Sequence, residues 1–168
     1  MLKKLIPDFV FQNIEDIEVG FLRGNGIKGV AVDIDNTLAK YSESIPSGEV
    51  LRWCGEIKAG GIALCIISNS RRGERAKEIG GAVSCGYIHN AKKPLGKGFV
   101  WAAKTMGLPP EEICVIGDQI FTDVLGAKRA GMKACAVYPR GMGENPLFKL
   151  RRFLEAPFIN RAAKANKK

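Results

Sequence analysis

Histidine is nearly absent from this chain of 168 residues, in which His89 is the only one. Cysteine occurs five times, but no two cysteines form a Cys-x-x-Cys pair. Because protein zinc sites are built mainly from cysteine and histidine at short spacings, this composition argues against a zinc site. Three of the cysteines, Cys65, Cys114 and Cys135, lie inside apolar runs. We therefore expect buried free thiols in a reducing cytosol.

Long hydrophobic runs are missing as well. The longest extends only from Ile62 to Ile67, whereas a helix that crosses a bilayer needs about 20 apolar residues. Pro7 and Asp8 interrupt the first residues before the apolar core of a signal peptide develops. No repeat, low-complexity segment or linker divides the chain. The sequence therefore predicts a single domain over residues 1–168 and a cytoplasmic location, with or without peripheral attachment to a membrane.

Basic residues outnumber acidic ones by 26 to 17, which gives a net charge of +9. The excess is concentrated near the end of the chain. There, a lone Glu155 stands against the basic residues Lys149, Arg151, Arg152, Arg161, Lys164, Lys167 and Lys168. Such asymmetry indicates an anionic partner: a nucleic acid, a lipid surface or a phosphorylated substrate. For the last few residues the alternative is a solvated, frayed end.

Short apolar runs alternate with helix-like segments along most of the chain. Strands are expected at about 29–35, 62–68, 82–88, 113–117 and 133–137, with helices between them. This alternation predicts a parallel sheet with right-handed crossovers. Residues 1–28 show a rough helical period and are expected to form a short helical extension. A basic, partly apolar helix and its tail are expected at about 146–168.

The first of these strands ends in two carboxylates, Asp33 and Asp35. Alternation along a strand would place both on the same side. Two negative charges at such a short distance repel each other unless a cation lies between them. Carboxylate oxygens are ligands that suit Mg²⁺. The alternative is a turn in which an aspartate or asparagine caps the next helix.

Polar groups also follow the next three strands. Ser68 and Asn69 end the second strand, Lys93 follows the third, and Asp118 and Asp123 follow the fourth. Because parallel strands end at the same edge of a sheet, these groups should meet in one crevice. Taken alone, residues 68–70 could merely cap a helix. We prefer Lys93 to Lys92 because Pro94 follows it.

This combination suits phosphoryl transfer through an aspartyl-phosphate. A carboxylate can act as the nucleophile, and Mg²⁺ held by Asp33 and Asp118 would offset its repulsion with the phosphate. Asp35 is placed to protonate the leaving oxygen and later to deprotonate water. Ser68 and Lys93 can hold the phosphoryl oxygens.

The order Asp-x-Asp-Asn-Thr, Ser-Asn, Lys-Pro and Gly-Asp-Gln-x-x-Thr-Asp resembles the haloacid dehalogenase (HAD) superfamily of phosphatases. It is most similar to the YqeG-type IIIA branch, which is itself similar to phosphatidylglycerophosphate phosphatases. The chain departs from many relatives outside that branch at Asn36, where they have glycine. The resemblance implies Asp33 as nucleophile and Asp35 as acid and base, with the Asp35 main-chain carbonyl on Mg²⁺. It further implies Ser68, Asn69 and Lys93 on phosphate, Asp118 on the metal, and Asp123 and Thr37 in support.

With this resemblance, the expected fold is one doubly wound, Rossmann-like α/β domain of the HAD type. Its five-stranded parallel sheet should have the order 5-4-1-2-3. Residues 38–61 and 69–92 leave no room for a large cap domain, so the site should be open and suit a phosphate carried on something large.

The expected function is a Mg²⁺-dependent phosphomonoester hydrolase with phosphatidylglycerophosphate as substrate and an anionic phospholipid surface as partner. The alternatives are a phosphatase of nucleic-acid ends, sugars or proteins, and a nucleic-acid-binding protein with a vestigial site. No tight nucleic-acid partner is expected, and the oligomeric state is left open.

Overall fold

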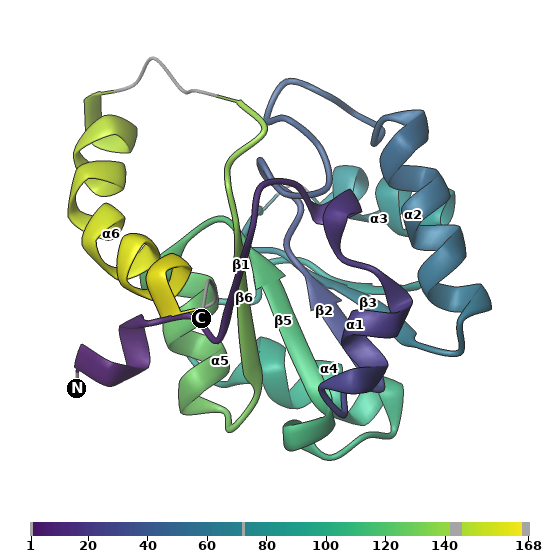
Figure 1. Ribbon diagram of the computed structural model, residues 1–168. Helices are drawn as coiled ribbons and strands as arrows, with labels where there is room; N and C mark the ends of the chain where they lie inside the picture. The colour runs from purple at the N-terminus through teal and green to yellow at the C-terminus, as the bar shows by residue number, and fades with distance from the viewer. Residues whose placement is uncertain (1, 72, 142–145, 166–168) are drawn as a thin grey trace.

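A computed structural model of the protein describes residues 2–71, 73–141 and 146–165 (Figure 1). The strands are β1 (Phe9–Phe11), β2 (Gly29–Val32), β3 (Ala63–Ile67), β4 (Gly86–Ile88), β5 (Ile113–Gly117) and β6 (Lys133–Val137). The α-helices are α1 (Val19–Gly24), α2 (Gly48–Ala59), α3 (Gly73–Val83), α4 (Lys97–Met106), α5 (Leu125–Arg129) and α6 (Pro146–Ala165). Short 3₁₀-helices η1 (Leu2–Leu5), η2 (Ile14–Asp16) and η3 (Pro110–Glu112) and a π-helix η4 (Ile120–Val124) complete the described elements.

All described strands run parallel in one sheet with the order β1-β6-β5-β2-β3-β4. Strand β2 lies between β3 and β5, so that Val30 is in register with Leu64 on one side and Cys114 on the other. Every residue of β2 is buried, as expected for a strand covered on both faces. The carboxyl ends of these three strands therefore meet at one edge of the sheet.

The predicted five-stranded sheet with order 5-4-1-2-3 is wrong, because the sheet has a sixth strand, β1, at its outer edge next to β6. The apolar spacing in residues 1–28 had indicated helices only. Asp8 shows why a strand forms instead: its main-chain N–H donates to the Ala134 carbonyl at 2.8 Å, and its carboxylate accepts from the Ala134 N–H at 2.8 Å. These contacts join segments far apart in the sequence, which local spacing cannot reveal.

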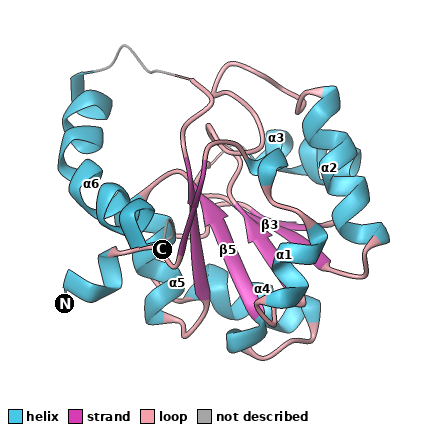
Figure 2. Ribbon diagram, viewed as in Figure 1, coloured by secondary structure: helices cyan, strands magenta, loops and turns pink. Residues whose placement is uncertain are grey.

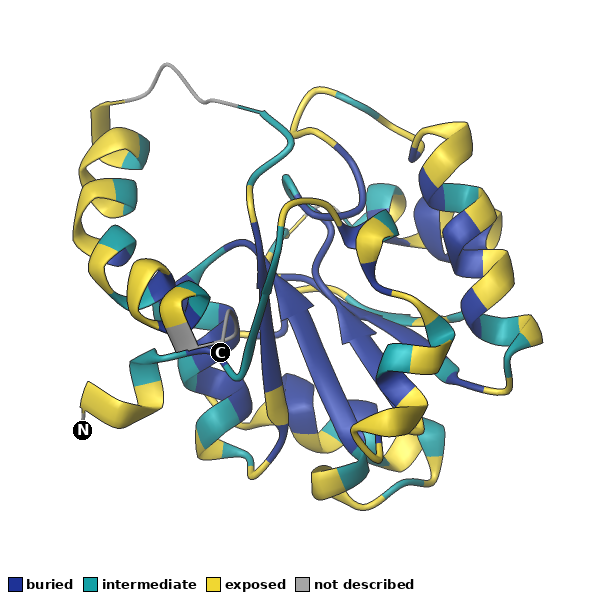
Figure 3. Cartoon of the chain, in the orientation of Figure 1, coloured by how far each residue is buried: buried dark blue, intermediate teal, exposed yellow. Residues whose placement is uncertain are grey.

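Helices cover both faces of the sheet (Figure 2). One core cluster joins α1, α2 and α3 to the sheet through residues such as Val32 and Ile66. A second cluster joins α4, α5 and α6 to the other face through residues such as Ala31 and Cys65. Adjacent residues of one strand thus belong to opposite cores, as strand alternation requires. The central strands β2 and β5 are buried along their whole length, whereas the edge strand β1 is only half-buried (Figure 3).

Helix α6 extends well beyond the predicted end at Glu155 and includes Pro157. It contacts β1 and η4, and its inner side buries Glu155, Ile159 and Ala162. Its outer side is exposed (Figure 3). Among the described helices, including this one, none is both long and apolar enough to cross a membrane.

The connections around β3 hold ordinary crossover helices. Between β2 and β3 lies α2, and between β3 and β4 the described residues form α3. No further domain is inserted in the described parts of these connections, so the carboxyl edge of β2, β3 and β5 has no cap from them.

Gly126 of α5 lies against the buried Phe99 ring of α4. A Cβ atom at this position would lie deep inside the contact distance of the buried Phe99 ring. We expect Gly126→Ala to lower the free energy of unfolding by about 1–3 kcal/mol, the usual effect of overpacking a core. Urea unfolding would measure this. The matched change Gly55→Ala lies in α2, where a Cβ meets no atom within 4 Å, and should raise stability by about 0.5–1 kcal/mol. Equal losses in both variants would contradict the packing explanation.

Candidate active site

The carboxyl ends of β2, β3 and β5 bring Asp33, Ser68 and Asp118 to one edge of the sheet, where all three are buried. Strand β5 ends at Gly117, and the π-helix η4 follows. A Cβ atom at Gly117 would lie 2.7 Å from the Cβ of Asp123, so only glycine lets this turn fold back against the strand. The Gln119 N–H donates to the Asp123 carboxylate at 3.1 Å and fixes it there. π-Helical turns are frequent at functional sites because they re-aim side chains.

Lys93 links two of the carboxylates. Its ammonium lies 2.6 Å from Oδ1 of Asp33 and 2.6 Å from Oδ1 of Asp123, and it donates to the Ile67 carbonyl at 2.9 Å. The ammonium thus lies among oxygen atoms of Asp33, Asp123 and Ile67. Lys92, the alternative considered above, is exposed, so Lys93 is the lysine that reaches the site.

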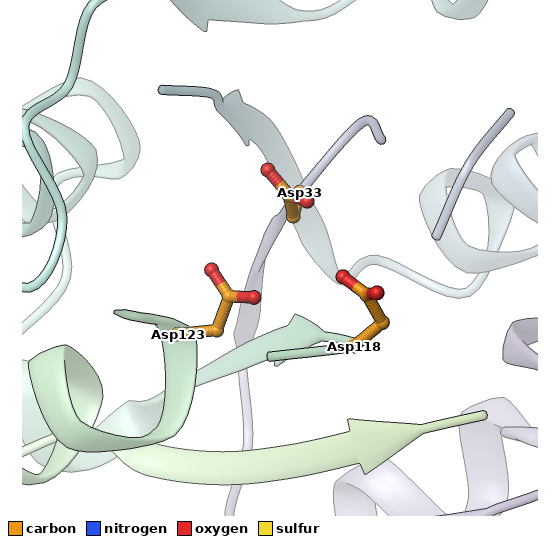
Figure 4. A group of neighbouring side chains, drawn as sticks. All are labelled: Asp33, Asp118 and Asp123. Atoms are coloured by element: carbon orange, nitrogen blue, oxygen red, sulfur yellow. The ribbon is translucent and has the colours of Figure 1, made fainter. Parts of the chain in front are cut away.

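Asp33, Asp118 and Asp123 point toward one another (Figure 4). Each offers a carboxylate oxygen, and these oxygens all lie within 4.8 Å of one another. Oδ1 of Asp118 is buried and has no hydrogen-bond partner among the described residues. A buried carboxylate oxygen without a partner is unfavourable, and a bound cation would satisfy it. The structure therefore gathers Asp33 and Asp118, both predicted as metal ligands, with Asp123 as the third carboxylate.

Burial and charge shift the pKa values of these groups. Burial raises the pKa of Asp33 to about 7, and Lys93 opposes this rise while Asp123 adds to it. Burial likewise raises the pKa of Asp118 well above its usual range, although the Arg152 guanidinium opposes the rise. Burial would lower the pKa of Lys93, but Asp123 and Asp33 outweigh it, so the pKa is raised and the ammonium stays charged. Such strongly perturbed groups are typical of functional sites.

Ser68 and Asn69 lie beside this cluster. The Ser68 hydroxyl accepts the Ser70 N–H at 3.1 Å. The Asn69 amide accepts the Lys93 N–H at 2.7 Å and donates to the Lys93 carbonyl at 3.0 Å. Asn69 thus holds the main chain of Lys93, while its expected contact with phosphate stays a prediction.

Residues 36 and 37 form the turn after β2. Asn36 has φ 59°, in the left-handed region that glycine and asparagine tolerate best. This explains physically why asparagine can stand where many relatives have glycine. Thr37 is fully buried, and its carbonyl accepts a hydrogen bond from Arg140 at 2.8 Å. The supporting role of its side chain stays a prediction.

The sequence model of the family described as haloacid dehalogenase-like hydrolase matches residues 39–131. The "Probable phosphatase YqeG" of Bacillus subtilis is 35% identical over 161 residues, covering 95% of this chain and 93% of the relative. The chain belongs to the haloacid dehalogenase-like hydrolases. The predicted superfamily and the predicted phosphatase class are thereby confirmed.

Two further matches of this hydrolase are more distant. Phosphatidylglycerophosphate phosphatase 1, chloroplastic/mitochondrial, of Arabidopsis thaliana is 28% identical over 84% of this chain, but the match spans only 43% of that protein. A solved structure of 3-deoxy-D-manno-octulosonate 8-phosphate phosphatase from Moraxella catarrhalis, in complex with a magnesium ion, phosphate and KDO, has a TM-score of 0.50. It is 21% identical and covers 84% of this chain and 95% of that one. The likeness to the Moraxella structure shows that the two proteins share a fold.

Asp35 of the hydrolase does not join the three-carboxylate cluster. Strand β2 ends at Val32, so the strand alternation expected to align Asp33 with Asp35 no longer applies. Asp35 instead forms an ion pair with Arg75 of α3. Arg75 also donates to the Glu43 carbonyl at 3.0 Å and the Lys40 carbonyl at 2.9 Å. It therefore ties the segment after Asp35 to α3.

Arg75 could not be singled out from the sequence. Arg71 and Arg72 lie nearer to Ser68 in the sequence, where they suit either a contact with an anionic headgroup or an exposed helix start. Arg71 is exposed, and Arg72 lies outside the described residues. No sequence signal separates these three arginines, because the choice depends on where α3 packs.

Arg152 and Glu155 of α6 were also missed as site residues. Arg152 pairs with the carboxylate of Asp118, and Glu155 is fully buried. The sequence analysis had counted Arg152 among the basic residues of the tail. The opposite charges of Arg152 and Glu155 at a spacing of three were the one signal of a shared helix face.

Proposed function

We propose that this hydrolase is a Mg²⁺-dependent phosphomonoesterase that works through a phosphorylated Asp33. One observation carries the proposal: the buried carboxylate of Asp33 contacts the Lys93 ammonium and lies within 4.8 Å of carboxylate oxygens of Asp118 and Asp123. An anionic nucleophile can approach an anionic phosphate only where positive charge offsets their repulsion. Lys93 supplies one such charge, and a divalent cation would supply the other.

The residues of the site fit Mg²⁺. They offer hard carboxylate oxygens, the ligands this cation prefers, and one of these, Oδ1 of Asp118, lacks a partner among the described residues. Oδ1 of Asp123 is already held by Lys93. We therefore assign the carboxylates of Asp33 and Asp118 to the metal, together with the main-chain carbonyl of Asp35 that the family resemblance implies. When bound, the cation would offset the charge that develops on the transferring phosphoryl group.

The proposed reaction has two steps. In the first, an oxygen of Asp33 forms a bond to phosphorus while the bond to the leaving oxygen breaks, and Asp35 gives that oxygen its carboxyl proton. In the second, Asp35 takes a proton from a water molecule whose oxygen attacks phosphorus. Inorganic phosphate leaves, and the Asp33 carboxylate is restored. The Lys93 ammonium and the Ser68 hydroxyl hydrogen are the proposed donors to the phosphoryl oxygens.

The proposed substrate is phosphatidylglycerophosphate. Support comes from the name of the Arabidopsis relative, a phosphatidylglycerophosphate phosphatase, and from a site that the described connections after β2 and β3 leave without a cap. A phosphate on a lipid headgroup at a membrane surface can reach such a site without being enclosed. We further propose that the enzyme is a single cytoplasmic domain that attaches peripherally to the membrane.

The outer side of α6 supports this attachment. Leu150, Phe153 and Leu154 are 55%, 77% and 50% exposed, and exposed Lys149, Arg161 and Lys164 lie on the same helix. Apolar side chains among basic ones suit an anionic lipid surface. Arg152 is not part of this surface, because it points to Asp118.

Changing Lys149, Arg161 and Lys164 to glutamine should weaken salt-sensitive binding to phosphatidylglycerol vesicles without altering turnover of a soluble aryl phosphate.

A substrate screen tests the proposed function. The purified enzyme with Mg²⁺ would be given phosphatidylglycerophosphate in mixed vesicles, phosphorylated oligonucleotides, sugar phosphates and phosphopeptides. The proposal expects the highest kcat/KM for the lipid. Preference for one of the other phosphates would overturn the substrate and keep the phosphatase. No turnover of any phosphate, together with salt-sensitive binding of nucleic acid, would favour a vestigial site.

The raised pKa of Asp33, about 7, predicts how Mg²⁺ binding depends on pH. An unfolded aspartate loses its proton near pH 4, whereas the folded protein keeps this one up to about pH 7. The metal-free protein should therefore lose stability as the pH rises through that window. Mg²⁺ binds the ionised carboxylates, so the rise in Tm that it causes should be larger at about pH 8 than at about pH 6. Thermal unfolding with and without MgCl₂ checks this. An equal rise in Tm on adding Mg²⁺ at both pH values would contradict this prediction.

A further inference from the structure

Arg152 of α6 contacts the Asp118 residue at two points. One guanidinium nitrogen pairs with Oδ2 of Asp118, and the other donates to the Asp118 main-chain carbonyl. The guanidinium is planar and rigid, and it contacts both the side chain and the main chain of Asp118. These contacts restrict the rotation of the Asp118 side chain. Asp118 is therefore fixed from outside the β5–η4 segment that carries it.

The guanidinium is itself held by α6. It donates to Oε2 of Glu155 at 3.2 Å, and it lies over the Phe148 ring, 4.8 Å from the centroid. Glu155 is fully buried, and its other oxygen accepts the Phe121 N–H at 3.2 Å. One turn of α6 thus places Arg152 against the residues that follow β5.

The two oxygens of Asp118 then have different surroundings. Oδ2 is held by Arg152, whereas Oδ1 is buried without a hydrogen-bond partner among the described residues and belongs to the three-carboxylate cluster. We propose that Arg152 is a positioning residue that holds Asp118 so that Oδ1 faces the metal. This inference rests on the Mg²⁺ site of the proposed function. Groups that orient a metal ligand in this way typically contribute 10–100-fold to metal affinity.

The positive charge of Arg152 would by itself repel a metal cation at the same carboxylate. Glu155, in contact with the same guanidinium, offsets that charge, so the Arg152–Glu155 pair is close to neutral as seen from the metal. When Arg152 is replaced, the lost positioning of Asp118 should therefore weaken Mg²⁺ binding more than the lost charge repulsion strengthens it. This gives the sign of the expected effect.

Titration of the substrate-free protein with Mg²⁺ in a calorimeter tests this role. Arg152→Gln should weaken Mg²⁺ binding by about 10–100-fold. The matched control Arg52→Gln makes the same charge change at an exposed position of α2 and should leave the Kd unchanged. Arg152→Lys keeps the charge but cannot hold side chain and carbonyl together, so it should also weaken binding. Circular dichroism in chelator would show whether each variant is folded.

Each result of the titration supports or overturns the positioning role of Arg152. Wild-type affinity in Arg152→Gln overturns the role of Arg152, and tighter binding would mean that the guanidinium competes with the metal. Full affinity in Arg152→Lys would reduce the role to charge alone and overturn the positioning. If Arg152→Gln does not fold, Arg152→Lys decides. A wild-type protein that binds no Mg²⁺ would overturn the proposed function along with this inference, which distinguishes the two failures.

Discussion

Asp33→Asn should abolish turnover, with a loss on the order of 10⁶-fold in kcat, as seen when an enzyme loses its nucleophile. An amide cannot form the phosphorylated intermediate that a carboxylate forms. The fold should survive, because Lys93 keeps its contacts with Asp123 and with the Ile67 carbonyl. The variant also removes a carboxylate whose ionised form is disfavoured by burial. Hydrolysis of an aryl phosphate in Mg²⁺ would measure the loss.

Asp16→Asn is the matched control, since it makes the same chemical change at an exposed aspartate and should leave turnover unchanged. Acid-quenched wild-type enzyme should carry covalent phosphate after reaction with a labelled substrate, and Asp33→Asn should carry none. Wild-type activity in Asp33→Asn would rule out an aspartyl-phosphate at this residue.

Asp35→Asn should lower kcat by roughly 10²–10⁴-fold, the usual contribution of a general acid and base. An amide can neither give a proton to the leaving oxygen nor take one from water. The loss should be greater for an alkyl phosphate than for an aryl phosphate, because an alkoxide needs its proton more. Asp35 contacts Arg75 rather than the carboxylate cluster, so its side chain is not needed to hold the other carboxylates.

Mg²⁺ affinity separates the two roles that Asp35 could have. The proposed metal contact at this residue is its main-chain carbonyl, so the Kd for Mg²⁺ should be nearly the same in Asp35→Asn. A collapse of Mg²⁺ affinity would show that the carboxylate is a metal ligand. An equal loss for alkyl and aryl phosphates would speak against proton transfer to the leaving group.

The gathering of Asp33, Ser68, Lys93 and Asp118 could be predicted from sequence because it follows from topology. Each residue comes directly after an apolar strand-like run or in the loop beyond one, and parallel strands end at one edge. The details depended on where β2 stops. Since it ends at Val32, Asp33 joins the cluster and Asp35 turns toward α3. A boundary error of a few residues was enough to misplace this one carboxylate.

Long-range contacts account for what the sequence could not predict. Strand β1 has three residues, and its pairing with β6 leaves no local pattern. The spacing of Arg152 and Glu155 shows that they share a helix face, but not what that face meets. Only the packing of α6 on η4 shows that it meets the end of β5.

A single helix, α6, carries both Arg152, which contacts Asp118, and the exposed apolar side chains of the proposed lipid-facing surface. If a bilayer shifts α6 so that Mg²⁺ binds tighter by some factor, then Mg²⁺ must tighten bilayer binding by the same factor. If the bilayer instead weakens Mg²⁺ binding, Mg²⁺ must weaken bilayer binding by the same factor. Vesicle affinity measured with Mg²⁺ and with chelator would therefore report how rigidly α6 connects the lipid-facing surface to Asp118, without any substrate being turned over.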